Sequence, residues 1–150
     1  MVHVLFVGAF ERQLDDKSRL ALPAPFRARL GEHCYLAKGL DRAVTVVPAA
    51  TFEAEAARLA ERVERGEADR QTLRALASSA QLVTLDKQGR VTVDEQLRAY
   101  AGLTPDAPVT VAGAFDRLEI WSPERYAQVT AEGTASMGGD PGSGRTIERE

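Results

Sequence analysis

The chain has 150 residues, of which 44% are hydrophobic and 27% are charged, and its formal net charge is −3. This composition is ordinary for a folded protein. Because the net charge is negative, the protein cannot bind polyanions such as nucleic acids through its overall charge alone. A nucleic-acid surface would therefore need local clusters of Arg and Lys, or the addition of further subunits.

The cysteine usage and the N-terminal segment both favour a cytoplasmic protein. Cys34 is the single cysteine, so no intrachain disulfide can form, which suits a reducing compartment. The apolar segment 1–7 lacks the basic residues of a signal peptide and is too short to span a membrane. We therefore expect no membrane partner.

The first third of the chain predicts two pairs of strands around a short helix. A polar connection at 15–19 separates the first two strands, which are antiparallel if that connection is a hairpin. Gly31 ends the helix, and Pro48 suits the first position of a following helix. The predicted elements are strands at 2–14 and 20–22, a helix at 24–30, and strands at 34–37 and 43–47.

Two amphipathic helices are predicted next. Apolar residues from Phe52 to Val63 recur at the spacing of one helix face, with charged residues opposite. Gly66 breaks this helix, and the apolar spacing from Leu73 to Ala80 predicts a second one. The Glu and Arg residues of both helices are typical of a solvated face.

From Ala80 onward the first pattern returns. Leu14–Pro23 aligns with Leu85–Asp94, so that an Asp-x-x-x-Arg sequence recurs in the second half of the chain. Leu40–Pro48 aligns with Phe115–Pro123, with a few additional residues in the loop that precedes the second copy. Two matching blocks in the same order indicate a duplication.

The duplication predicts an α+β, β-rich fold made of two tandem ββαββα halves. Each half is too small to bury much core alone, so the halves should pack together around a pseudo-two-fold axis. The Gly-rich composition near the C-terminus predicts a disordered tail. The predicted boundaries are 8–51 for the first repeat, 52–79 for a helical connection, 80–124 for the second repeat, 125–132 for the end of a C-terminal helix and 133–150 for the tail.

The sequence offers little support for an enzyme. His3 and His33 have no spacing to each other, to Cys34 or to a carboxylate that is typical of a metal site. The repeated aspartates could act as acid or base groups, but their Lys and Arg neighbours favour ionised carboxylates. We expect no catalytic residues, no metal, no cofactor and no small-molecule substrate.

The repeated Asp-x-x-x-Arg sequence is better explained as a device that positions arginines. The aspartate can accept backbone N–H bonds in a turn and can also hold the arginine that follows it in the motif. Arginines presented in this way suit phosphate contacts and guanine edges. The alternative is a local surface ion pair of little weight. The candidate DNA-binding residues are Arg12, Asp15, Lys17, Arg19, Asp86, Lys87 and Arg90.

These residues resemble the MraZ family of bacterial transcriptional regulators over about 1–130. The resemblance is carried by Gly8 and the strand that follows it, and by Leu14–Ala24, Phe26–Arg27, Leu36–Gly39, Leu85–Val91 and Ile120–Ser122. It implies two swapped-hairpin SpoVT/AbrB-like halves that form a double barrel, and ring-shaped homo-oligomers. It also implies sequence-specific binding to double-stranded DNA, at repeated promoter boxes of the division and cell-wall gene cluster that include the protein's own operon. A nucleoid-associated cytoplasmic location would follow.

In that family the Asp-x-x-x-Arg loops contact DNA, which points to Asp15 and Arg19 and to Asp86 and Arg90. Lys17 matches a basic residue often found in the first loop, whereas Arg12 and Lys87 are added on electrostatic grounds. Ser18 departs from the frequent Gly or Asn, so a positive φ there is less favourable. Pro25 replaces a basic residue that is common in the family. With Arg12 and Lys17 beside Arg19, the first loop is expected to carry more of the DNA contact.

Three other functions are compatible with the sequence. An AbrB-like antitoxin would bind a toxin as well as DNA, although the Gly-rich tail lacks apolar anchors for a docking helix. A small hydrolase would use the Asp loops with a metal ion. A structural ring protein would assemble without binding DNA.

Overall fold

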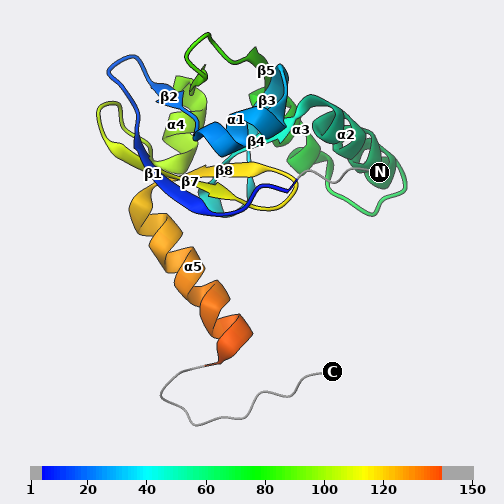
Figure 1. The fold of residues 1–150 in the computed structure, drawn as a ribbon. Helices are drawn as coiled ribbons and strands as arrows, with labels where there is room; N and C mark the ends of the chain where they lie inside the picture. Colours follow the sequence, from blue (N-terminus) through cyan, green and yellow to red (C-terminus); the bar gives the residue numbers. More distant parts are fainter. Residues whose placement is uncertain (1–4, 140–150) are drawn as a thin grey trace.

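The computed structural model describes residues 5–139 and shows an α+β fold rich in antiparallel strands (Figure 1). The two predicted ββαββα halves are both present, and the last helix of the first half is one of the two helices that lead to the second half. The first half contains β1 (Ala9–Gln13), β2 (Arg19–Ala21), α1 (Ala24–Leu30), β3 (His33–Lys38), a short turn η1 (Leu40–Arg42) and β4 (Val44–Pro48). The helices α2 (Ala49–Glu64) and α3 (Arg70–Ser79) follow. The second half contains β5 (Gln81–Thr84), β6 (Arg90–Thr92), α4 (Glu95–Ala101), β7 (Pro108–Gly113), β8 (Leu118–Trp121) and α5 (Pro123–Gly138).

The halves exchange strands. The six-stranded sheet has the order β1-β7-β8-β4-β3-β5, so the first strand of each half lies at an edge formed by the other half. The second strands, β2 and β6, leave that sheet and pair with each other. The predicted β1–β2 hairpin is therefore wrong, because each strand pairs with the second half. The swapped arrangement implied by the family resemblance is confirmed.

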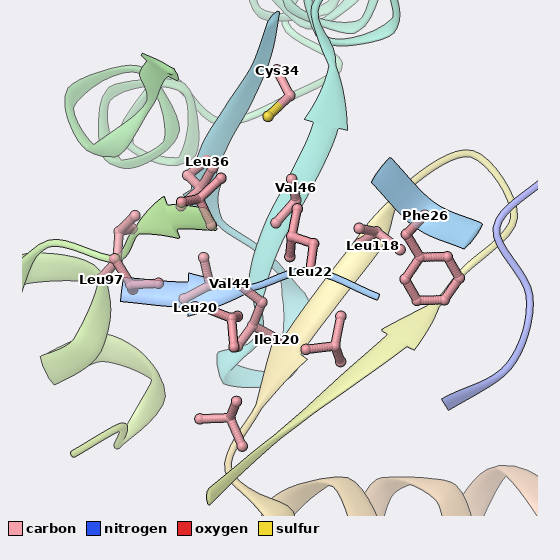
Figure 2. Packing of buried hydrophobic residues seen from close by; sticks show 14 of the residues in the cluster. Leu20, Leu22, Phe26, Cys34, Leu36, Val44, Val46, Leu97, Leu118 and Ile120 are labelled. Carbon is pink, nitrogen blue, oxygen red and sulfur yellow. The ribbon is translucent and has the colours of Figure 1, made fainter. Parts of the chain in front are cut away.

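The exchange is fixed by the shared core. Leu20 of β2 lies opposite Val91 of β6, and both are buried against the larger sheet. Since alternate residues of a strand face opposite sides, this pairing turns Arg19 and Ala21 away from the core. Figure 2 shows the central part of the cluster, with side chains from both halves. Its labelled members are Leu20, Leu22, Phe26, Cys34, Leu36, Val44, Val46, Leu97, Leu118 and Ile120.

The second hairpins repeat with a shift of one residue that the sequence alignment missed. The structure matches Val44 to Leu118, which face the same core cluster, whereas the alignment matched Val44 to Glu119. The first turn is longer, because the N–H of Gly39 donates to the carbonyl of Ala43, whereas the N–H of Ala114 donates to the carbonyl of Arg117. Because alternate residues of a strand face opposite sides, a shift of one residue exchanges the two faces. The sequence alignment therefore matched core-facing residues of one strand to residues of the other that face away from that core.

Helices α2 and α5 begin at equivalent points of the two halves, and each packs an aromatic ring against an aromatic residue of the sheet. Phe52 of α2 stacks on Tyr35 with ring centroids 4.4 Å apart. The ring centroid of Tyr126 in α5 lies 6.1 Å from that of Trp121. Pro48 precedes α2 at its N-cap position, rather than at the first helical position as predicted. Among the described residues, no helix is long and apolar enough to cross a membrane.

The C-terminal helix is longer than predicted. Helix α5 continues to Gly138, through residues 133–138 that were assigned to a disordered tail. Ala and Met are good helix formers and offset the cost of Gly133, which is about 1 kcal/mol relative to Ala. The helix ends where Gly139 takes a φ of 74° and its N–H donates to the carbonyl of Ala135. The remainder of the predicted tail, 140–150, lies outside the described residues.

Truncation of Leu20 should destabilise the whole fold, because this side chain is fully buried where the halves interlock. We expect Leu20→Ala to lower the free energy of unfolding by about 2–5 kcal/mol, measured by urea denaturation. Leu82→Ala is the control, since Leu82 is 58% exposed; its effect should stay within about 0.5 kcal/mol. Equal losses in the two variants would contradict the interlocked core.

Candidate nucleic-acid interface

The first Asp-x-x-x-Arg sequence forms a turn closed by its aspartate. Oδ1 of Asp15 accepts the backbone N–H of Lys17 at 2.9 Å and that of Arg19 at 2.8 Å. Oδ2 accepts the side-chain Nε–H of Arg19 at 2.7 Å. One carboxylate therefore fixes both the path of the turn and the direction of the arginine.

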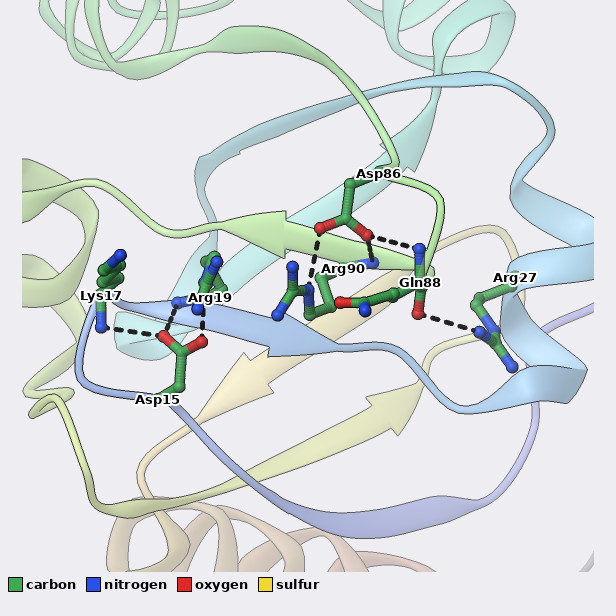
Figure 3. A network of polar contacts seen from close by, with 7 residues as sticks. All are labelled: Asp15, Lys17, Arg19, Arg27, Asp86, Gln88 and Arg90. Atoms are coloured by element: carbon green, nitrogen blue, oxygen red, sulfur yellow. Dashed lines mark hydrogen bonds and ion pairs between the residues drawn. The ribbon is translucent and has the colours of Figure 1, made fainter.

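The second sequence forms the same turn. Oδ1 of Asp86 accepts the backbone N–H groups of Gln88 and Arg90, both at 2.9 Å. Oδ2 accepts Nε–H of Arg90 at 2.8 Å. Two sequences from different halves of the chain therefore fold into loops with equivalent hydrogen bonds (Figure 3). We call residues 15–19 the first loop and residues 86–90 the second loop.

Both loops need one residue with a left-handed backbone. Ser18 has a φ of 61° and Gly89 has a φ of 72°. In each loop this residue donates its N–H to the carbonyl of the aspartate, at 3.0 Å for Ser18 and 2.9 Å for Gly89. The positive φ that the sequence made unfavourable at Ser18 is present, because the hydrogen bonds of Asp15 hold the turn around it.

Each loop is anchored to the opposite half. The N–H of Val93 donates to the carbonyl of Ser18 at 2.9 Å, and the N–H of Leu22 donates to the carbonyl of Gly89 at 3.1 Å. These bonds extend the β2–β6 pairing at both ends. The two loops are therefore the two ends of one antiparallel ribbon.

The ribbon places Arg19 and Arg90 on one outward face. Arg19 lies opposite Thr92, and Arg90 lies opposite Ala21, which makes the arginines diagonal neighbours at a typical separation of about 7–8 Å between Cα atoms. Their side chains are 33% and 26% exposed. Among the described residues, each binds its aspartate through Nε only. The terminal guanidinium nitrogens are thus left to bind phosphate oxygens or base edges.

The aspartates are held in the charged form. The pKa of Asp15 is lowered from its ordinary value, first by the backbone N–H of Arg19 and then by that arginine's side chain and the N–H of Lys17. The pKa of Asp86 is lowered in the same way by Arg90 and Gln88. The carboxylates thus act as acceptors that orient the arginines.

The structure places six of the seven candidate residues in the two loops, and the lysines among them are exposed. Arg12 is elsewhere, on β1, where its guanidinium lies 5.5 Å from the centroid of the Phe10 ring and donates to the carbonyl of Glu11. The six residues in the loops are Asp15, Lys17, Arg19, Asp86, Lys87 and Arg90.

Sequence reasoning missed Arg27 as a site residue. This residue of α1 reaches across to the second loop, where its Nη1 donates to the carbonyl of Gln88 at 3.2 Å (Figure 3). The family resemblance includes Phe26 and Arg27, but nothing in the sequence indicates that Arg27 reaches the second loop. The strand exchange, which lays α1 beside the second loop, could not be derived from local patterns.

The lowered pKa values give the aspartates a pH-dependent contribution to stability. A depressed folded-state pKa stabilises the protein above the unfolded-state value, near 3.8, and this contribution is lost as the pH falls through the folded-state pKa. The variant Asp15→Asn/Asp86→Asn should therefore be less stable than wild type at neutral pH, with the difference shrinking below pH 3.8.

Urea denaturation over a pH series measures this difference. The exposed neighbour Asp16→Asn is the control and should follow the wild-type profile. A gap between the Asn variant and wild type that stays constant at all pH values would contradict the linkage.

Comparison with known proteins agrees with the duplication. The family model described as "MraZ protein, putative antitoxin-like" matches the chain twice, over residues 5–75 and 76–148. The protein named transcriptional regulator MraZ from Corynebacterium jeikeium is 44% identical over 85% of this chain and 88% of its own length. The MraZ regulator from Micrococcus luteus is 41% identical over 89% of this chain and 92% of its own.

A third relative, from Saccharopolyspora erythraea, carries the same name and is 41% identical over 81% of this chain and 84% of its own. The matches thus extend over both halves and both loops. On this evidence of sequence and fold, the chain belongs to the MraZ family.

Proposed function

We propose that this protein is a sequence-specific DNA-binding transcriptional regulator, and that the two loops of the β2–β6 ribbon form its DNA-binding face. The observation that carries the proposal is the repetition of one hydrogen-bonded Asp–Arg loop at both ends of a single ribbon. Relatives named as transcriptional regulators agree with it.

The ribbon has the chemistry that DNA binding requires. Each arginine is fixed at Nε, so little side-chain entropy remains to be lost when its outer nitrogens bind a phosphate or a guanine edge. Lys17 and Lys87 are exposed beside the arginines and add charge without a fixed geometry. Arginines therefore supply direction, and lysines supply attraction that is independent of sequence.

One ribbon alone is a weak DNA-binding site. The acidic residues of the first loop cancel its positive charge, the aspartate of the second loop offsets part of it, and the whole chain has a net charge of −3. Several ribbons on one DNA would raise the overall affinity by effective concentration, without a new kind of contact. We therefore infer a ring-shaped homo-oligomer acting on several short repeated boxes. The proposed targets are promoter boxes of the division and cell-wall gene cluster, including the protein's own operon.

Two alternative functions would require different features of the protein. An antitoxin would also need a surface for its toxin, and α5, which extends away from the sheets and has no fully buried residue, offers an exposed helix for that purpose (Figure 1). A structural ring would assemble without DNA. Binding assays with DNA alone separate the structural ring from the other two functions.

The loop arginines should be required for DNA binding. In gel shifts on the gene's own upstream DNA, Arg19→Ala and Arg90→Ala should each weaken binding, and each should reduce the slope of log affinity against log salt by about 1 for each phosphate that the arginine neutralises. Arg65→Ala is the control, because Arg65 pairs with Glu67 beyond the end of α2. Wild-type affinity in both loop variants would remove these arginines from the function.

The assembly should contain more than two subunits. Light scattering on the full chain should give a mass that is a multiple of 16.3 kDa and larger than a dimer. Because each subunit adds one ribbon, DNA with several boxes should bind more tightly and with a steeper salt slope than DNA with one box. A monomer with equal affinity for both DNAs would contradict the ring.

A further inference from the structure

The two loops differ in one contact. The side chain of Arg27 lies directly over Gly89, so that a Cβ built at Gly89 would stand 2.1 Å from Cδ and 2.3 Å from Nη1 of Arg27. In this position Nη1 of Arg27 donates to the carbonyl of Gln88. Any side chain at position 89 would therefore displace Arg27 from this position.

Within the described part of the chain, the first loop has no corresponding contact. Arg98 occupies in α4 the place that Arg27 occupies in α1, at the same spacing as the two loops. Its Nη1 donates to the carbonyl of Val93 at 2.6 Å, within its own half. The residue equivalent to Gly89 is Ser18, which is 5% exposed and carries a Cβ. The difference between glycine and serine thus accompanies a difference in where the two arginines point.

We propose that Arg27 is a further DNA-contacting residue, and that Gly89 admits it to the second loop whereas Ser18 excludes Arg98 from the first. This inference rests on the proposed function of the loops. It assigns three basic residues to the second loop, one of which comes from the other half of the chain. The residue at the left-handed position of each loop thereby sets how many arginines that loop offers to DNA.

The contacts of Arg27 suit a phosphate ligand. Within residues 5–139, its side-chain hydrogen bond uses Nη1, and Nε and Nη2 are left for an acceptor outside the protein. The side chain is partly exposed, and the bond to the carbonyl of Gln88 holds it against the second loop, which also carries Arg90. A phosphate facing the second loop could accept from both arginines. On this proposal the DNA contact is divided more evenly between the two loops than the sequence predicts.

The test is the salt dependence of binding to duplex DNA from the gene's own upstream region. Arg27→Ala should weaken binding and reduce the slope of log affinity against log salt by about 0.9 for each phosphate that Arg27 neutralises. Arg27→Lys should keep most of the slope, because it keeps the charge. Arg98→Ala, the matched control, should leave the slope unchanged.

A second variant tests the role of Gly89 separately. Gly89→Ser gives the second loop the residue that the first loop accommodates at a φ of 61°, so the turn itself should persist. It should displace Arg27 and lower the salt slope as Arg27→Ala does. Combined with Arg27→Ala, it should weaken binding no further, because both changes remove the same interaction. Thermal melting of each variant checks that the fold is kept.

The outcomes separate this inference from the proposed function. Loss of binding in Arg19→Ala and Arg90→Ala, with an unchanged salt slope in Arg27→Ala, would overturn the role of Arg27 and leave the loops as the DNA-binding face. Additive losses from Gly89→Ser and Arg27→Ala would overturn the assigned role of Gly89. A wild-type protein that binds no DNA would overturn both proposals.

Discussion

The pairing of β2 with β6 is the contact on which the rest of this molecule depends. Leu20 and Val91 meet across it and are buried against the larger sheet, so neither half can complete its core without the other. The same pairing turns Arg19 and Arg90 outward together. Core formation and presentation of the candidate DNA-binding face thus follow from one strand exchange, because a strand directs alternate residues to opposite sides.

Charge balance explains how arginines can lie as neighbours on this ribbon. Each guanidinium is paired with the aspartate that opens its own loop, and each aspartate also accepts two backbone N–H groups. The carboxylate therefore reduces repulsion between the arginines while it fixes their direction. The same compensation lowers the positive charge of a single ribbon, which is the physical reason to expect binding through several subunits.

Small differences break the symmetry of the duplication. One additional residue in the turn after β3 shifts the alignment of the two hairpins and keeps Val44 and Leu118 on the same core face. With glycine at position 89, Arg27 lies over the second loop. With serine at position 18, Arg98 bonds within its own half instead. Both differences are single-residue changes whose consequences depend on what packs against them from the other half.

The duplicated elements, the position of each loop and the Asp–Arg pairing within it could be predicted from the sequence, because these depend on residues close together in the chain. Local patterns wrongly joined β1 and β2 as a hairpin, and they gave no sign that Arg27 reaches Gln88. They also ended α5 too early, because a glycine-rich composition predicts disorder whereas residues 133–138 continue the helix. The folded structure was needed to identify which strands pair and which arginine contacts which loop. Burial of apolar faces contributed by distant segments selects among strand pairings that are locally equivalent.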